Sequence, residues 1–425
     1  MFIKQQKWLV KSFVTMHFSK VLLTLLLCLF EINLLSAQTL DIKAASALIM
    51  DETTGKVLWE REAHTKRYPA STTKIVTAMT ALERAKLDQM IQAPKGVDQI
   101  GEASIGLKPS EPISIRDLTY AALVKSANDA SYALALHIAG SVKNFAELMN
   151  EKAKQLGCKN TSFKNPHGLN EPGHLTTAYD LALIAREAMK NPQFREMVKT
   201  SRYKLTRNDP ASLSWITSKN RSLEVDPTAD GIKTGWTIPA GQCFVGSATR
   251  DGKRIITVIL KSTDWIKDNA QMLDWAFEHH EWQCVAKEGE PLTQVQISNG
   301  MERKIKVGPL SDLYCVNTKG AAFTKQIRCE PFSSIKAPIR KGMTLGIAHL
   351  TDATGHVQKV PLVALDHVEP FESALVQKNT PLPITAFLSL LLGSSVFTLF
   401  VGSLKVTPFA KLALEPGKRV SQNAP

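Results

Sequence analysis

The feature that most restricts what this chain can fold into is a pair of hairpin signals set far apart in the sequence. Residues 45–50 and 56–59 are strand-like and flank Asp-Glu-Thr-Thr-Gly, and residues 242–248 and 254–261 flank Asp251-Gly252. Both turns contain the glycine that short hairpin loops favour. Two antiparallel strand pairs are therefore predicted, one near each end of a single domain.

The sequence between the two hairpins is predominantly helical. Apolar residues recur at helical spacing in 72–86 and 181–189, and they are nearly continuous in 118–124 and 130–138, as in buried helices. An antiparallel sheet built from both ends of a domain, with a helical cluster inserted and packed on it, accounts for both observations. We therefore predict an α+β fold for residues 38–282.

Residues 283–375 have a different character. Short segments of alternating polarity follow one another, with Asn299-Gly300 and Thr354-Gly355 at two of the turns. Alternation with glycine-containing turns is typical of hairpins. A small all-β domain is therefore predicted after the α+β domain, and a length of 425 residues accommodates both.

Residues 1–37 have the three parts of a secretory signal peptide. Four lysines precede the apolar run Val21–Phe30, and Leu35-Ser36-Ala37 supplies small residues for cleavage. Polar residues that interrupt the end of the apolar run leave an uncleaved anchor as the alternative, and Met16 is an alternative start. Each version predicts that the rest of the chain is exported.

A second apolar segment lies near the C-terminus. Residues 382–402 are long enough to cross a bilayer and contain no charged residue. The tail, 403–425, carries four basic residues against the single acid Glu415, as the positive-inside rule expects of a cytoplasmic tail. We predict a transmembrane anchor that holds the folded domains on the periplasmic side of the cytoplasmic membrane. A buried core helix is the alternative, although two serines and two glycines make this a mediocre soluble helix.

The chain is basic, with 52 Lys and Arg against 39 Asp and Glu and a formal charge of +13. No basic helix with interleaved aromatics and no nucleic-acid motif accompanies this charge, and export makes nucleic acid an unsuitable partner. Anionic lipid head groups or an anionic cell-wall polymer fit better. Diffuse surface charge without a partner is an equal alternative.

Five of the six cysteines follow the signal peptide, so they cannot all pair with one another. No two have the spacing of a zinc knuckle or of a redox C-x-x-C motif. We predict buried apolar cysteines with at most one bridge, between Cys315 and Cys329. His279 and His280 lack zinc-ligand spacing with other ligands, so no metal site is predicted.

The motif Ser71-Thr72-Thr73-Lys74 stands where an apolar helical segment begins. Residues i and i+3 of a helix share a face, so the Lys74 amine can reach the Ser71 hydroxyl, and the helix N-terminus offers N–H groups to a developing oxyanion. A simple N-cap role for Ser71 is the alternative. The same Ser-x-x-Lys pattern recurs at Ser201 and Ser333, but without a comparable buried helix behind it.

Two further short motifs accompany this one. Ser126-Ala127-Asn128 lies in the break between two apolar helical runs, and Lys233-Thr234-Gly235 lies just ahead of the second hairpin. Either one alone is as short as ordinary loop sequence. In this order and context, the three motifs resemble the Ser-x-x-Lys, Ser-x-Asn and Lys-Thr-Gly triplet of the penicillin-binding proteins and serine β-lactamases.

Longer matches narrow the resemblance to one family. Residues 69–74, 165–169 (Asn-Pro-His-Gly-Leu), 177–181 (Thr-Ala-Tyr-Asp-Leu) and 230–235 (Asp-Gly-Ile-Lys-Thr-Gly) are similar to the low-molecular-mass penicillin-binding proteins that are serine-type D-alanyl-D-alanine carboxypeptidases. The similarity covers residues 40–280. It implies a penicillin-binding-protein or serine β-lactamase-like fold, followed by the β domain and the C-terminal membrane helix that the family also carries.

This family removes the terminal D-alanine from peptidoglycan stem peptides and is acylated by penicillins and other β-lactams. The resemblance implies that Ser71 is the nucleophile, that Lys74 is its general base, and that Ser126 relays a proton to the leaving D-alanine. Asn128 would hold Lys74 and the substrate amide. Burial and the nearby charge of Lys233 would keep Lys74 neutral.

The third motif would bind the substrate. Lys233 and Thr234 would hold the terminal carboxylate, and Gly235 would let the peptide lie close to the strand. The backbone N–H groups of Ser71 and Trp236 would form the oxyanion hole. No cofactor and no metal enter this scheme.

The chain departs from the family pattern at two positions. Ala127 stands where glycine is usual, which adds one methyl group that points away from the chemistry, and Trp236 stands where histidine is frequent, which would reshape the cleft. His167 and Asp180 match family positions near the cleft, but a turn and a helix N-terminal acid explain them without a catalytic role.

Three alternatives remain open at this point. A serine β-lactamase of the commonest class needs a Glu-x-x-Leu-Asn loop, which the sequence lacks. A D,D-endopeptidase or transpeptidase uses the same acyl-enzyme and differs only in the acyl acceptor. A cell-wall scaffold, whose β domain binds other wall proteins and whose enzyme is weak, is the third. Stem-peptide length and oligomeric state are not encoded in any motif.

Overall fold

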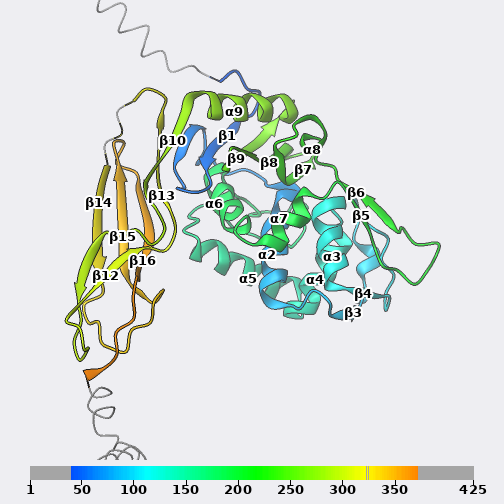
Figure 1. Cartoon of the computed structure of the whole chain (residues 1–425). Helices are drawn as coiled ribbons and strands as arrows, with labels where there is room; N and C mark the ends of the chain where they lie inside the picture. Colours follow the sequence, from blue (N-terminus) through cyan, green and yellow to red (C-terminus); the bar gives the residue numbers. More distant parts are fainter. Residues whose placement is uncertain (1–39, 322, 324, 372–425) are drawn as a thin grey trace, which may run out of the picture.

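A computed structural model describes residues 40–371, apart from 322 and 324, and arranges them as an α+β domain with an all-β domain beside it (Figure 1). The predicted signal peptide (1–37), membrane anchor (382–402) and tail (403–425) lie outside the described residues. Within the described part of the chain, no helix is both long enough and apolar enough to span a bilayer.

A five-stranded antiparallel sheet forms the centre of the α+β domain. Its order is β2-β1-β9-β8-β7, which leaves β7 at one edge. The first hairpin joins the second through β1 and β9, so both ends of the domain build one sheet, as predicted. The strands are β1 (Ser46–Asp51), β2 (Val57–Arg61), β7 (Ala229–Thr237), β8 (Gly241–Arg250) and β9 (Lys253–Ser262).

Both faces of this sheet are covered, because its central strands are apolar on both sides. Leu48 and Met50 of β1 pack into the cluster that contains the inserted helices, whereas Ala47 and Ile49 pack against residues of α9. Figure 1 shows α9 on one face and the helical cluster on the other. The helices are α2 (Lys74–Arg84), α3 (Ile115–Tyr120), α4 (Asn128–Ala139), α5 (Val142–Gln155), α6 (Ala178–Ala188), α7 (Pro192–Lys199), α8 (Ser222–Val225) and α9 (Trp265–His279).

Shorter elements connect these helices. The 3₁₀ helices η1 (Ala70–Thr73) and η2 (Val97–Gln99) and the π-helical turn η3 (Ala121–Lys125) interrupt the helical cluster. Two small hairpins project from it, formed by β3 (Met90–Gln92) with β4 (Pro112–Ser114) and by β5 (Arg202–Lys204) with β6 (Trp215–Thr217). Each of these strands has only three residues, too few to show alternating polarity, and they were not predicted from the sequence.

The C-terminal domain is all β, as predicted. One antiparallel sheet has the order β11-β12-β16-β15-β14 and encloses an apolar cluster, and β10 pairs with β13. The strand β10 begins directly after α9 and spans the predicted boundary at residue 282. The strands are β10 (His280–Ala286), β11 (Thr293–Gln296), β12 (Lys304–Pro309), β13 (Leu313–Thr318), β14 (Lys325–Pro331), β15 (Thr344–Asp352) and β16 (Val357–Ala364).

The predicted disulfide between Cys315 and Cys329 is wrong. Neither residue is in a disulfide. Cys315 of β13 packs with Leu313 and Leu350 in one apolar cluster, whereas Cys329 of β14 packs against a different one. The two cysteine side chains therefore pack in separate apolar clusters, as small apolar side chains do.

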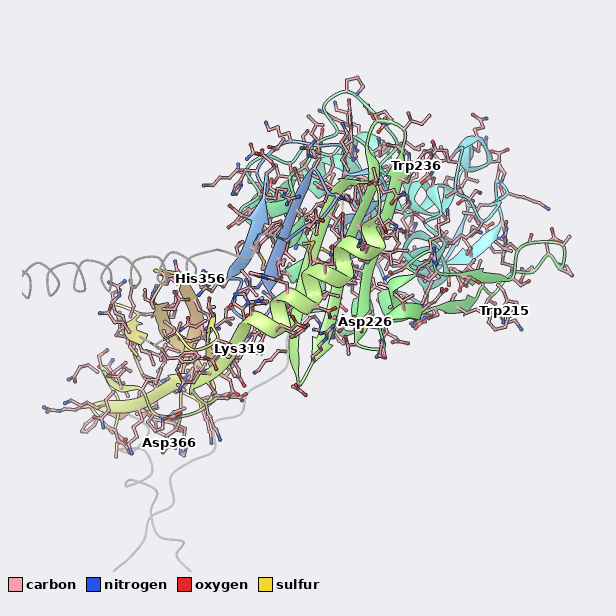
Figure 2. The ribbon with its side chains drawn as sticks, turned by 90° about the horizontal axis from the view of Figure 1, so that it is seen from above. Trp215, Asp226, Trp236, Lys319, His356 and Asp366 are labelled. Carbon is pink, nitrogen blue, oxygen red and sulfur yellow. The ribbon has the colours of Figure 1, made fainter. Side chains whose placement is uncertain are left out.

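The two domains meet at the turn between β1 and β2. Lys56 donates from Nζ to Asp352 Oδ2 and to the Val316 carbonyl, both at 2.7 Å, and Trp282 Nε1 donates to Asp51 Oδ2 at 2.7 Å. Figure 2 shows His356 at this junction and Trp236 at the far end of the sheet. The candidate site therefore lies away from the β domain.

Candidate active site

Ser71 lies in the 3₁₀ turn η1, and the α-helix α2 begins at Lys74. Ser71 therefore stands at the start of a helix, as predicted, although its own turn is 3₁₀ and the α-helical part begins three residues later. In a 3₁₀ helix, side chains at i and i+3 eclipse one another, which brings Ser71 and Lys74 closer than an α-helical turn would. Lys74 Nζ lies 3.0 Å from Ser71 Oγ.

Lys74 is fully buried beneath the nucleophile. Its Nζ also donates to Asn128 Oδ1 and to the carbonyl of His167, both at 2.7 Å. Burial first, and the charges of Lys233 and Lys219 next, hold the pKa of Lys74 well below its ordinary value. The lowered pKa favours the neutral amine, whose two N–H bonds can point to Asn128 and His167 and whose lone pair can then point to Ser71 Oγ.

Ser126 links the second motif to the third. It adopts a left-handed conformation, with φ of 65°, between η3 and α4. Its Oγ accepts a 3.0 Å hydrogen bond from Lys233 Nζ, which also donates to the Thr234 carbonyl at 2.9 Å. Burial, followed by the charge of Lys219, lowers the pKa of Lys233 to about 7.

Asn128 is fixed by the loop at residues 101–107. Its Nδ2 donates to the Gly101 carbonyl at 2.9 Å, and its backbone N–H donates to the Ala103 carbonyl at 2.7 Å. The neighbouring carboxylate of Asp129 accepts from the backbone N–H groups of Ile105 and Leu107. The loop and the second motif therefore form one rigid unit.

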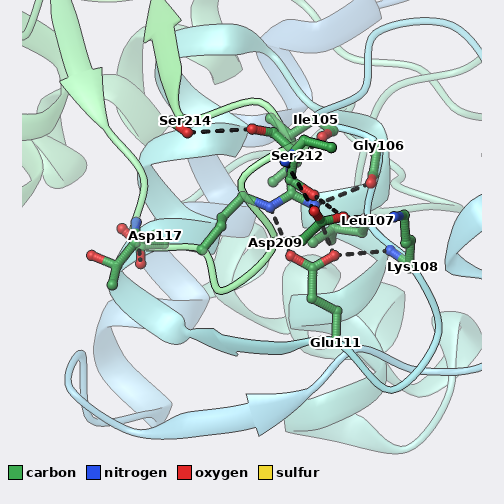
Figure 3. Close-up of polar contacts among 12 residues, drawn as sticks. Ile105, Gly106, Leu107, Lys108, Glu111, Asp117, Asp209, Ser212 and Ser214 are labelled. Carbon is green, nitrogen blue, oxygen red and sulfur yellow. Dashed lines mark hydrogen bonds and ion pairs between the residues drawn. The ribbon is translucent and has the colours of Figure 1, made fainter.

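A buried arginine ties this loop to the β5–β6 hairpin. Arg207 donates from Nε and Nη2 to the carboxylate of Glu111, both at 2.7 Å, and from Nη1 to the carbonyl of Ile105 at 2.6 Å. Lys108 and Asp209 add an ion pair at 2.8 Å on the exposed side. Figure 3 shows these contacts bridging the two segments.

Glycine at 235 is required by the packing of β7 against η1. A Cβ at this position would lie 2.9 Å from the Ser71 nitrogen and 3.1 Å from the Thr72 nitrogen, closer than side chains normally approach backbone. From the sequence, the space beside Gly235 is predicted to receive the substrate. The structure assigns part of it to the nucleophile's own backbone.

These elements enclose a cleft of about 740 Å³, a size typical of ligand sites. The predicted residues Ser71, Ser126, Asn128, Thr234, Gly235 and Trp236 line it, and Lys74 and Lys233 lie behind them. Trp236 is 61% exposed. All eight predicted residues therefore converge on one place.

The cleft also contains residues that the sequence analysis missed. Lys219 and Arg221 form a cationic rim, and Glu102, Asp264 and Trp265 complete the lining. Lys219 and Arg221 lie in the connection between β6 and α8, where the sequence shows no motif. Their position shortly before Lys-Thr-Gly is the only sequence signal that they lie near the cleft.

His167 and Asp180 have structural roles, as expected. The His167 carbonyl holds Lys74, and the ring Nδ1 accepts from the Leu169 N–H at 3.3 Å. Burial, and then the charge of Lys74, lowers the pKa of His167 to about 3, so the ring is neutral. Asp180 accepts from the Asn160 N–H and the Thr161 hydroxyl, which fixes the chain before α6.

Histidines 279 and 280 lie at the end of α9, and their rings contact helix carbonyls. Across residues 40–371, omitting 322 and 324, no group of three or more His, Cys, Asp or Glu side chains is arranged to hold a metal ion.

The sequence and the fold both match known proteins. The family model described as D-alanyl-D-alanine carboxypeptidase matches residues 33–264, and that described as penicillin-binding protein 5, C-terminal domain, matches residues 281–370. The D-alanyl-D-alanine carboxypeptidase DacF of Bacillus subtilis is 33% identical over 72% of this chain and 80% of its own length.

Two solved structures share the fold. Penicillin-binding protein 5 of Haemophilus influenzae is 25% identical, with a TM-score of 0.63 over 79% of this chain and 100% of that chain. A peptidoglycan synthesis regulatory factor (PBP3) of Streptococcus pneumoniae is 27% identical, with a TM-score of 0.64 over 77% of this chain and 100% of that chain. The fold is therefore penicillin-binding-protein-like, with a C-terminal β domain.

Proposed function

Because this chain belongs to the D-alanyl-D-alanine carboxypeptidase family, we propose that it removes the C-terminal D-alanine from peptidoglycan stem peptides through an acyl-enzyme on Ser71. The observation that carries the proposal is the contact between Ser71 and a fully buried Lys74, whose pKa is held well below its ordinary value, first by burial. A buried amine whose pKa is lowered is more readily neutral, so at 3.0 Å it is a suitable base for a serine hydroxyl.

In the acylation step, the Ser71 hydroxyl gives its proton to Lys74 as Oγ bonds to the carbonyl carbon of the penultimate D-alanine. The N–H groups of Ser71 and Trp236 hold the oxyanion, consistent with the close approach of β7 to η1 at Gly235. A proton passes through Ser126 to the leaving nitrogen, the C–N bond breaks, and free D-alanine departs. Water then hydrolyses the ester.

The terminal carboxylate binds the third motif. Thr234 lines the cleft, and Lys233 stands behind it with a pKa of about 7, set mainly by burial. Lysine at this pKa is only partly charged near neutral pH, and the exposed side chains of Lys219 and Arg221 add positive charge at the same rim. A β-lactam carboxylate would meet the same groups.

The decisive test measures D-alanine release from a peptide ending in D-Ala-D-Ala, together with labelling by a fluorescent penicillin, for wild type and Ser71→Ala. We expect both signals in the wild type and neither in the variant. Labelling that depends on Ser71 without D-alanine release assigns the acyl-enzyme to an endopeptidase, a transpeptidase or a scaffold with weak activity. A folded wild type that is not labelled contradicts the proposal.

We propose a cell-envelope location, with residues 1–37 as the export signal, 38–282 as the catalytic domain, 283–375 as the β domain and 382–402 as the anchor. The lysines, apolar run and small residues of 1–37 and the apolar, uncharged run at 382–402 support this arrangement. A chain that ends at residue 371 should leave the membrane fraction while keeping its ability to bind penicillin. Persistence of that shortened chain in washed membranes contradicts the anchor.

A further inference from the structure

The residue before the nucleophile has an unfavourable backbone conformation. Ala70 has φ of 48°, in the left-handed region that side chains other than glycine rarely adopt. Its carbonyl oxygen accepts a 2.8 Å hydrogen bond from Thr73 Oγ1, and a Cβ on Gly168 would overlap that same oxygen. The surrounding structure therefore fixes the direction of this carbonyl.

The conformation of Ala70 decides where a proposed oxyanion donor points. The carbonyl of Ala70 and the N–H of Ser71 belong to one planar trans peptide, in which they point in opposite directions. Any group that holds the carbonyl therefore also aims the Ser71 N–H. That nitrogen lies on the side of η1 facing β7, because a Cβ on Gly235 would come within 2.9 Å of it.

A buried histidine completes the support for this peptide. His174 is 1% exposed, and its Nε2 lies 2.9 Å from Thr73 Oγ1. Its Nδ1 accepts a 3.0 Å hydrogen bond from the backbone N–H of Lys164. A backbone N–H can only donate, so Nδ1 must be the acceptor and the ring proton resides on Nε2. His174 therefore donates to Thr73, and Thr73 donates to Ala70.

We propose that His174 is a positioning residue for acylation: through Thr73 it fixes the Ala70 carbonyl and thereby aims the Ser71 N–H at the oxyanion. His174 is not among the residues that line the cleft, so it acts through the backbone and not on the substrate. The inference rests on the proposed function, because it assigns a role in the acyl-transfer step.

The neutral ring is the only form that fits this chain of hydrogen bonds. A second proton on Nδ1 would face the Lys164 N–H, donor against donor. Burial first, and then the charges of Lys164 and Lys74, lower the pKa of His174 to about 4. The ring therefore stays neutral, and the direction of the chain is preserved, at neutral pH.

Replacing His174 by glutamine or by asparagine tests its two hydrogen bonds one at a time. His174→Gln reaches as far as Nε2 and can still donate to Thr73, whereas His174→Asn reaches only as far as Nδ1 and can still accept from Lys164. We expect the acylation rate with fluorescent penicillin to stay within about threefold of wild type for the glutamine variant and to fall at least about tenfold for the asparagine variant. For D-alanine release, kcat should fall while KM changes little, because the binding groups lie on other elements.

His280→Gln is the matched control for loss of a buried histidine. Its ring lies at the end of α9 and contacts the Ala276 carbonyl, so it should lower thermal stability without changing acylation. Acylation by His174→Asn at the wild-type rate overturns the inference. The inference is also overturned if the acylation rate falls equally in the glutamine and asparagine variants and the fall parallels their loss of thermal stability.

Thr73 supplies a second test that leaves His174 intact. Thr73→Val removes the hydroxyl at almost constant shape and should slow acylation like His174→Asn, whereas Thr73→Ser should retain the rate. The double variant Thr73→Val/His174→Asn should be no slower than either single one, and additive losses contradict a shared chain. A wild type that is not acylated rejects the proposed function itself, whereas a labelled wild type with a normal Thr73→Val variant rejects only the role of His174.

Discussion

At the scale of single residues, the site is governed by three lysines around one nucleophile. Lys74 and Lys233 are buried, and the exposed Lys219 lowers the pKa of both. Burial disfavours the charged form of a lysine, and each neighbouring cation disfavours it further. Burial and two neighbouring lysines therefore favour the neutral form of Lys74 and outweigh the opposing charges of Glu102 and Asp129.

Replacing Lys219 should move the pH dependence of acylation. In Lys219→Gln, one positive charge disappears, the pKa of Lys74 rises, and a smaller fraction of Lys74 is neutral at a given pH. The rising limb of the acylation rate against pH should therefore shift to higher pH, measured with a fluorescent penicillin. Lys219→Arg keeps the charge and should keep the profile; an unshifted limb in the glutamine variant would show that Lys219 does not act on the base.

At the scale of elements, the nucleophile depends on how closely edge strand β7 approaches η1. Gly235→Ala would place a methyl group 2.9 Å from the Ser71 nitrogen. The two elements must separate, and we expect acylation to slow by about tenfold to a hundredfold. Gly101→Ala is the matched control, because no atom lies within 4 Å of its added Cβ. Equal rates for the two variants would mean that β7 and η1 can separate without cost.

The hydrogen bonds of Arg207 should matter more than its charge. Arg207→Lys keeps the positive charge but loses the paired contact with Glu111 and the contact with the Ile105 carbonyl. We expect faster amide hydrogen exchange at residues 104–107 and a modest fall in acylation, because the loop that holds Asn128 loosens. Unchanged exchange in this loop would show that Asp129 alone is sufficient to hold it.

The elements also show which parts of the fold and site the sequence could reveal. The hairpins and buried helices follow from apolar periodicity, and the three motifs from residue types that recur at a fixed spacing, so both were predicted. Lys219, Arg221, Arg207 and His174 act through contacts distant in sequence, which no local pattern encodes. The close packing of Gly168 against the Ala70 carbonyl likewise joins residues about a hundred positions apart, which no local pattern shows.

At the scale of the whole molecule, a buried ion pair joins the β domain to the catalytic domain, beside the hydrogen bond from Trp282 to Asp51. The side chains of Lys56 and Asp352 are 11% and 5% exposed, and their charged atoms lie 2.7 Å apart. The contact joins the turn after β1 to the end of β15. The orientation of the catalytic cleft relative to the β domain therefore depends on a few side chains at the junction.

Lys56→Met should uncouple the two domains. It leaves the Asp352 carboxylate buried without its cation, which should destabilise the junction by about 3 kcal/mol. We expect thermal unfolding in two steps and a larger radius of gyration in solution scattering, with unchanged penicillin acylation, because the cleft lies at the far end of the sheet. The double variant Lys56→Met/Asp352→Asn removes the unpaired charge and should recover much of the loss; a single unfolding step in Lys56→Met would contradict a coupling role for the pair.

The same pair should make the junction sensitive to acid. Although burial acts to raise the pKa of Asp352, hydrogen bonds from Lys56 and Thr354 outweigh it, and the pKa lies below its ordinary value of 3.8. A carboxylate with a lowered pKa contributes its stability in full above the unfolded value and loses it as the pH falls through the folded one. The difference in unfolding free energy between wild type and Lys56→Met should therefore shrink as the pH falls, first through the raised pKa of the unpaired carboxylate in the variant and then through the lowered pKa in the wild type. A difference that persists unchanged to pH 2 would mean that packing around Lys56, and not its charge, holds the domains together.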